Sequence, residues 1–529
     1  MRARKTRTSL SARDIDYAHG RFDSGTQASR KHGQVARVSH RAQRALSVTE
    51  ATLSLALLVS FLSVRDLPLV DLPQHAVQLA SWLKLSAHDP SVSDLELNFR
   101  TPYLLGYPIA RALAAFVPVL VALKLTFWAS ISLQAVALRK LCQQLQHDPW
   151  LGLLGFPLGL GYSFCFGFVA FCAAVPLIYL GMLYAVRQRE SPSVRNGLAL
   201  ASSLGLLLVA HGVALAFLLV VIGPLLLWGS GRAWQRLLPL SAPVVLGMLW
   251  LAPGGTSTRL GGDLWAFEPE RLLELPGQLV GIGAADHAAS ALGCLLLAAV
   301  ACSLGRPRSL VSALPLLAAL LGYAFFPTLF RGAGPLGPRF SVYIVPALLL
   351  ACSPRATRTR AGSSYPRALI LLTAGSVVTL FALRLPDFNR ETAGFHALAA
   401  RLTPGLTVRP LVFDRASRAF PGTPAHLHVP AYYVLEKGGS AGYSFAMYSI
   451  SVVRLRAGAR VLMGGGAEWA PERFDPNLEG SSYDYFIVKS ADDRTAELFG
   501  GASPLAVLDQ HSGDWWGYRR TSPRNRPYP

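Results

Sequence analysis

Long apolar stretches, separated by short polar segments, run through the first three quarters of the chain. A helix of roughly 20 apolar residues crosses a hydrocarbon core of roughly 30 Å, so each of these stretches is a candidate membrane span. The pattern predicts ten clear spans, at residues 47–65, 149–163, 166–187, 195–211, 212–229, 235–252, 287–304, 308–326, 338–353 and 366–384.

The stretch 103–140 is too long for one span and awkward for two. Loop charge decides, because loops rich in Lys and Arg stay in the cytoplasm. If residues 103–117 form an interfacial helix and 119–140 the span, every basic junction falls on one side, namely those at Arg139–Lys140, Arg187–Arg195, Arg232–Arg236, Arg306–Arg308 and Arg355–Arg367. We therefore predict eleven spans, with the N-terminus cytoplasmic and the C-terminus on the far side.

Composition supports a membrane protein and argues against a nucleic-acid-binding one. Hydrophobic residues make up 52% of the chain and charged residues only 15%, against roughly 25% in a soluble protein. The net charge of +20 is spread over the short loops and over residues 1–46, which hold eleven Lys and Arg against three Asp. We read 1–46 as a disordered basic cytoplasmic tail and 47–65 as a retained signal anchor, because a cleaved signal peptide would begin nearer Met1.

The remaining domain boundaries follow from this topology. Residues 47–384 form the transmembrane domain, with extracytoplasmic loops 66–118 and 253–286, the latter holding an amphipathic helix near 269–283. Residues 385–529 have nearly balanced charge and predict a soluble extracytoplasmic α/β domain. Within it we expect helices at 388–402 and 427–437, and strands at 409–414, at 483–489 and on both sides of a Ser-Gly-Asp turn near the end.

The richest polar constellation directly follows the first span. Asp66 and Asp71 lie at the outer membrane surface, and Pro73 suits the first turn of a helix that Asp71 can cap. His75 and Gln78 share one face of that helix. Taken alone, composition and spacing favour a structural interpretation, in which Asp71 is only an N-cap and His75 only an interfacial polar side chain.

Here the chain resembles the GT-C superfamily of glycosyltransferases, which take a sugar from a polyprenyl-phosphate carrier. The Asp-Leu-Pro-Gln-His stretch at 71–75 is similar to the acidic motif of that family's first outer loop, and Gly-Pro-Arg-Phe at 337–340 precedes a late span as in the family. The resemblance implies a mainly helical, polytopic GT-C-like bundle, with Asp71 as general base, His75 assisting it and Asp66 as the alternative base.

The same resemblance implies a site for the donor. Arg339 would hold the phosphate through two-pronged hydrogen bonds, with His211, Arg331 and Gln78 as further substrate-binding candidates. The competing interpretation of Arg339 is an interfacial side chain that reaches toward water, and that of His211 is a polar hairpin residue.

Metal and cofactor signals are weak. The six cysteines lie in or beside apolar segments without metal-ligand spacing, and His426 and His428 share a strand-like face without a third ligand. We expect no cofactor; a divalent metal is compatible with the sequence but not indicated.

The sequence thus predicts a glycosyltransferase in the cell inner membrane, with a polyprenyl-phosphate-linked sugar as donor, the lipid bilayer as surroundings, and a glycan, lipid or protein as acceptor. Two alternatives stay open: a transporter or flippase of a lipid-linked substrate, and a membrane assembly subunit. A transporter would carry charges deep within its spans, whereas Lys124 is the main such residue here.

Overall fold

The computed structural model describes residues 24–250, 270–283, 285–326, 334–355, 360–500 and 504–522. Contacts divide the chain into two compact units, Met1–Ala51 and Thr52–Pro529, each described by itself. Helix α1, Ser24–Leu62, contains residues of both units. Residues 24–46 are helical, whereas the sequence predicted a disordered tail there. They continue an apolar helix, and extending a helix costs less free energy than starting one. Residues 1–23 lie outside the described part.

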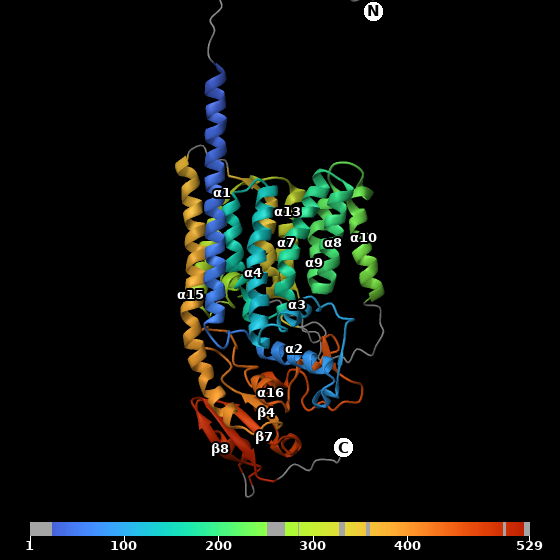
Figure 1. The fold of residues 1–529 in the computed structure, drawn as a ribbon, viewed down its shortest axis with the longest axis vertical. Coiled ribbons are helices and arrows are strands. Elements are labelled where there is room, and N and C mark those ends of the chain that lie inside the picture. Colours follow the sequence, from blue (N-terminus) through green and yellow to red (C-terminus); the bar gives the residue numbers. More distant parts are fainter. Residues whose placement is uncertain are drawn as a thin grey trace, which may run out of the picture. The chain divides into compact units, whose positions relative to one another are not determined.

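The second unit contains a bundle of apolar helices (Figure 1). In the described residues, four helical segments are long and apolar enough to cross a membrane, at Arg41–Leu62, Val119–Gln144, Val169–Glu190 and Ser364–Arg401, and five more apolar helices are shorter. The bundle helices after α1 are α4 (Val119–Gln144), α7 (Val169–Glu190), α8 (Val194–Ala210), α9 (Gly212–Leu227), α10 (Ala233–Trp250), α12 (His287–Ser303), α13 (Leu310–Phe325), α14 (Ser341–Ala351) and α15 (Arg360–Arg401).

One expected span, 149–163, is not a single helix. It consists of the 3₁₀-helix η2 (Pro149–Leu154) and the short helices α5 (Gly155–Gly159) and α6 (Tyr162–Cys165). A Cβ on Gly155 would lie 2.4 Å from Ala135 of α4, so glycine permits a close approach that apolar composition alone does not reveal. The segment still runs between both ends of the bundle, since Asp148 pairs with Arg367 and Phe164 stacks on Phe61.

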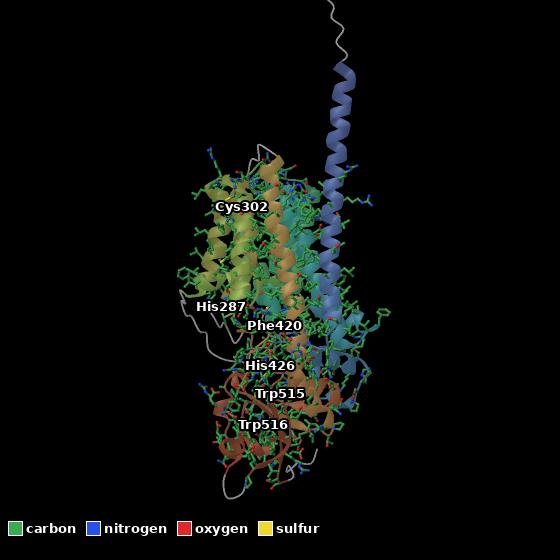
Figure 2. The ribbon with its side chains drawn as sticks, turned by 90° about the vertical axis from the view of Figure 1, so that its left-hand side faces the viewer. His287, Cys302, Phe420, His426, Trp515 and Trp516 are labelled. Carbon is green, nitrogen blue, oxygen red and sulfur yellow. The ribbon has the colours of Figure 1, made fainter. Side chains whose placement is uncertain are left out.

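The two ends of the bundle differ. At one end the short strands β2 (Leu304–Pro307) and β3 (Cys352–Pro354) pair with each other. At the other end lie α2 (Leu72–Ser86), the short 3₁₀-helix η1 (Pro90–Val92), α3 (Gly106–Leu113) and α11 (Glu270–Val280), where sequence predicted interfacial and amphipathic helices. Figure 2 shows Cys302 and His287 at opposite ends of α12, with His287 toward the α/β part.

The expected span 366–384 and the expected helix 388–402 are one helix, α15, which runs from the bundle into the α/β part (Figure 1). The helix continues through Pro386 because its neighbours are packed, with Leu385 and Phe388 each 1% exposed. Its last turns cover a five-stranded sheet of order β5-β4-β7-β9-β8, in which β4 is parallel to β5 and β7 and the other pairs are antiparallel.

The strands of this sheet are β4 (Thr407–Val412), β5 (Ser440–Ala441), β7 (Tyr485–Lys489), β8 (Ala506–Ser512) and β9 (Trp515–Arg520). Side chains alternate along β7, as the strand period of two requires. Tyr485 and Ile487 pack with α15 and α16 (Ala431–Lys437), whereas Phe486 and Val488 pack on the opposite face. The small helices between residues 467 and 499 are the 3₁₀-helices η5 (Ala467–Trp469), η6 (Pro471–Arg473) and η7 (Gly480–Ser482), with α17 (Pro476–Glu479) and α18 (Thr495–Phe499).

The first loop is joined to the α/β part by backbone pairing. Strand β1 (Leu95–Leu97) pairs antiparallel with β6 (Val453–Leu455), with Leu97 opposite Val453. The side-chain amide of Gln78 both donates to the Val453 carbonyl (2.9 Å) and accepts from its N–H (3.0 Å). This clamp sets α2 at a fixed position between the bundle and the 3₁₀-helix η4 (Phe445–Met447) of the α/β part, where the candidate site lies.

Candidate functional site

A cavity of about 620 Å³ opens where the first loop, the bundle and the α/β part meet. The bundle contributes an aromatic wall from residues 166–171, and the α/β part contributes a second wall from residues 443–452 and 465–469. The polar and charged side chains that line it come from widely separated segments: Asp71, His75, Tyr103, Tyr107, His211, Arg339, His428, Tyr443, Tyr448, Ser451 and Glu468. Four residues singled out from sequence, Asp71, His75, His211 and Arg339, therefore face the same space.

Asp71 does not act as the helix cap that the sequence suggested. It occupies the position before α2, but its side chain accepts no capping hydrogen bond. The local backbone is held instead by the broken helix, because the N–H groups of Val70 and Asp71 donate to Cys165 O (3.1 Å) and Phe166 O (2.9 Å). Gly167 has φ +80°, and a Cβ there would lie 3.1 Å from Asp71 N. The backbone is thus fixed without the carboxylate, which is left for the cavity.

The surroundings of the Asp71 carboxylate favour its protonated form. Its side chain is 14% exposed, and His428 Nε2 lies 3.4 Å from Oδ1. Burial raises its pKa from 3.8 to about 8; the positive charge of Arg339 lowers that value and the negative charge of Glu468 raises it. A carboxyl group with this pKa exchanges its proton near neutral pH, as a general base requires.

His75, one turn into α2, is fixed by a different partner from the one expected. Its Nδ1 lies 2.6 Å from the Tyr107 hydroxyl, so the hydrogen bond joins α2 to α3 rather than to Asp71. Its ring meets Phe445 edge-on, with centroids 5.4 Å apart. Burial lowers the pKa of His75 to about 3, and burial together with the charge of His75 does the same to His428. Both imidazoles are neutral at pH 7 and can donate one hydrogen bond each.

Arg339 belongs to the 3₁₀-helix η3 (Gly337–Phe340) at the head of α14 and is 7% exposed. Its Nε and Nη2 donate to the carbonyls of Pro335 and Gly334, each at 2.9 Å. The guanidinium lies over the Phe168 ring, 3.8 Å from its centroid. These contacts fix the orientation of a buried cation that has no carboxylate within salt-bridge distance among the described residues.

His211 presents a second donor beside Arg339. It is the break between α8 and α9, and its Nδ1 accepts the N–H of Ala214 at 3.2 Å. The proton of the neutral ring therefore sits on Nε2, which lies 3.4 Å from Arg339 Nη1. Two donors that face one another this way do not bond to each other; both can bind one anion.

The remaining candidates lie elsewhere. Asp66, 1% exposed, accepts hydrogen bonds from the Thr392 hydroxyl (2.8 Å) and His396 Nε2 (2.6 Å) of α15. Gln78 clamps β6 and is not among the cavity-lining residues. Arg331 lies outside the described residues.

Sequence reasoning missed the contribution of the α/β part. His428 was paired with His426 as a shared face, but His426 instead meets Glu391 at 3.0 Å while His428 enters the cavity. Glu468 also lines the cavity, and burial raises its pKa to about 7. The run Gly464-Gly465-Gly466 before an acid and a tryptophan was a usable signal, since Gly466 has φ +85°. Within the described ranges, no group of three or more His, Cys, Asp or Glu could hold a metal ion.

The fold and site describe a polytopic membrane protein with a C-terminal α/β part, as the sequence predicted. No protein-family model matches the chain, and no curated protein sequence matches it. Among solved structures, ArnT from Cupriavidus metallidurans bound to undecaprenyl phosphate is similar, with a TM-score of 0.55 over 91% of this chain and 99% of that chain, at 11% identity. The expected mainly helical, polytopic fold with a C-terminal α/β part is therefore confirmed, and it is similar to the fold of ArnT.

Proposed function

We propose that this protein is a GT-C-like glycosyltransferase that moves a sugar from a polyprenyl-phosphate carrier to an envelope acceptor at the outer face of the inner membrane. The observation that carries the proposal is the single cavity that holds an uncapped carboxyl group, Asp71, together with a buried, oriented cation, Arg339. The undecaprenyl phosphate bound to the structurally similar ArnT supports a carrier lipid of the same class.

The reaction assigns one task to each group. Asp71 takes the proton of the acceptor hydroxyl as its oxygen attacks the anomeric carbon, which contributes roughly 10²–10⁴-fold. The bond from that carbon to the phosphate oxygen breaks, and its electron pair leaves with the phosphate. Arg339 and His211 Nε2–H hold the charge that develops there, while His428, 3.4 Å from Asp71, keeps the carboxylate oriented.

The outer-face orientation rests on loop charge. In a variant without its native cysteines, Asp94→Cys in the first loop should react with a membrane-impermeant thiol reagent in spheroplasts, and Ser191→Cys between α7 and α8 should not. Both positions are exposed, so labelling reports the side of the membrane. The opposite labelling pattern would place the cavity in the cytoplasm and refute the proposed direction.

The enzymatic proposal is tested by incubating purified protein with a panel of labelled polyprenyl-phosphate sugars and an envelope extract. We expect release of free polyprenyl phosphate by the parent protein and not by Asp71→Asn. A transporter would instead bind or move the lipid without cleaving it. Absence of cleavage with every member of the panel would favour that alternative. The buried Lys124 does not indicate a transport path, because its ammonium donates to the Val64 carbonyl at the end of α1 (2.5 Å).

A further inference from the structure

A second, larger cleft of about 1070 Å³ lies in the α/β part and plays no role in the reaction described above. It opens beyond the carboxyl ends of the parallel strands β4 and β7, where Phe413, Asp414, Lys489 and Ala491 line it. Ligands of α/β sheets bind in such crevices. The side chain of His426, labelled in the α/β part in Figure 2, also lines this cleft.

The side chain of Lys489 places a buried positive charge in the lining of the cleft. Its side chain is only 5% exposed, and its Nζ lies over the Trp515 ring, 5.5 Å from the centroid. Its ion-pair partner in the described structure is Asp514 at 3.5 Å, beyond normal hydrogen-bond length. A buried ammonium with three donors and one distant partner is costly unless a ligand completes its hydrogen bonds.

The cations around Asp514 outnumber the carboxylate that they contact. Arg418 also lies 3.5 Å from Asp514, so two cations share one carboxylate. Two other acids of the cleft have partners, since Asp387 pairs with Arg390 and Glu391 with His426, and Asp414 is the remaining acid of the lining. Arg415, which donates to the Trp469 carbonyl, adds a further cation.

Trp469 connects the cleft to the catalytic cavity, because it lines both. Its side chain is 40% exposed, and the Arg415 guanidinium lies 5.8 Å from its ring centroid. An exposed aromatic face between acids and bases suits a sugar ring, whose C–H face packs on the indole while its hydroxyl groups both donate and accept. Trp469 is therefore the side chain that a ligand in the cleft and a ligand in the catalytic cavity would both contact.

We propose that this cleft binds the acceptor, and that the acceptor is a saccharide with an anionic substituent, a carboxylate or a phosphate, held by Lys489 and Arg418. This inference rests on the proposed transferase function for the role of the ligand, but not for its chemistry. The hydroxyl to be glycosylated extends past Trp469 into the cavity, and the rest of the saccharide stays outside the bundle. The cleft thus determines which acceptor reaches the base.

The test measures binding of three matched probes to the full-length protein in detergent micelles: maltopentaose, maltopentaose phosphorylated at one end, and pentagalacturonate. We expect at least one anionic probe to bind about tenfold or more tightly than the neutral one, because charge-assisted hydrogen bonds are stronger. Comparison of the phosphate and uronate probes identifies the anionic group. Lys489→Met, which keeps the volume, and Arg418→Ala, at a side chain 86% exposed, should each remove most of that preference.

Arg519→Ala is the matched control, since Arg519 is an exposed arginine of the same sheet outside the cleft. Undecaprenyl phosphate binding should be unchanged in all three variants. The proposal is overturned if no probe binds the parent protein, or if both cleft variants bind as the parent does. A protein that cleaves polyprenyl-phosphate sugars yet binds no probe refutes the cleft alone. If the protein cleaves no polyprenyl-phosphate sugar but binds an anionic probe in a way that depends on Lys489, the proposed transferase function is refuted. The proposed class of ligand, an anionic saccharide, is then supported.

Discussion

Asp66 and Asp71 lie five residues apart in one loop, and their surroundings are opposite. The Asp66 carboxylate is buried against α15, where a hydroxyl and an imidazole donate to it. The Asp71 backbone is fixed by residues 165–167 instead, and its carboxylate faces a cavity that the cation Arg339 also lines. A carboxylate that accepts short hydrogen bonds from a neighbouring helix has a structural role, whereas a carboxylate that faces a cavity, with His428 at 3.4 Å as its near partner, is available to a substrate. The following substitutions test that difference.

The largest expected effect is on Asp71. Asp71→Asn keeps the shape of the side chain but removes the base, so the transfer rate should fall by a factor on the order of 10²–10⁴. Thermal stability should stay near that of the parent, because the carboxylate makes no capping hydrogen bond. Initial rates of polyprenyl phosphate release, with Asp66→Asn as the matched control, measure this. An Asp71→Asn protein as active as Asp66→Asn would exclude Asp71 as the base.

Arg339 should give the next largest effect. Arg339→Ala removes a charge-assisted phosphate contact of about 1.5–3 kcal/mol, which corresponds to roughly ten- to hundredfold weaker donor use. Arg339→Lys should recover only part of the loss, since lysine lacks the planar fork. Donor kcat/KM measures the change, and Arg100→Ala, at an exposed arginine of the first loop, is the control. Unchanged donor kinetics in folded Arg339→Ala protein would leave this residue a helix anchor.

The pKa values predict the pH dependence. The base must be deprotonated, and burial raises the pKa of Asp71 to about 8, so kcat/KM should fall about tenfold for each pH unit below that value. His75 and His428, with pKa values lowered to about 3, should not titrate in this range. Glu468→Gln should move the profile toward lower pH, because it removes a negative charge that raises the Asp71 pKa. A flat profile between pH 6 and pH 9 would contradict the assignment of the base; this pH range is about two units below and one unit above the Asp71 value.

Asp66 should show the smallest effect on activity and a clear effect on stability. Asp66→Asn weakens the hydrogen bonds from Thr392 and His396 and should destabilise the fold by about 1–3 kcal/mol. The folded fraction should retain its turnover. Thermal unfolding followed beside activity separates the two, and Thr392→Val, which removes one of the same bonds, should lower the midpoint in the same direction. Loss of turnover without loss of stability would make Asp66 the base instead.

Much of the architecture was predictable because it depends on local pattern. Apolar runs, loop charge and strand alternation predicted most bundle helices, the interfacial helices and the strands β4, β7, β8 and β9 of the α/β part. The expected span at 149–163 was wrong as a single helix, because its glycines pack against α4 and only tertiary contact reveals that. The expected break between the span 366–384 and the helix 388–402 was likewise wrong, because packing around Pro386 keeps α15 continuous.

The site was predictable on one side only. Asp71, His75, His211 and Arg339 all lie at the ends of apolar segments on the same side of the predicted membrane, so topology alone brought them near one another. His428 and Glu468 come from the far end of the chain and reach the cavity through the pairing of β1 with β6 and the Gln78 clamp. No periodicity in the sequence reports such contacts. The expected helix cap by Asp71 was wrong for the same reason, since residues 165–167 hold its backbone instead.

The most direct test of the account is a structure of this protein with undecaprenyl phosphate bound. The account predicts the phosphate within hydrogen-bond distance, roughly 3 Å from its oxygens, of both Arg339 and His211 Nε2, on the opposite side of the cavity from Asp71. The polyprenyl chain should leave along the aromatic wall of residues 166–171 toward the bilayer. A phosphate bound elsewhere, with Arg339 still donating only to the carbonyls of Gly334 and Pro335, would contradict the proposed donor site.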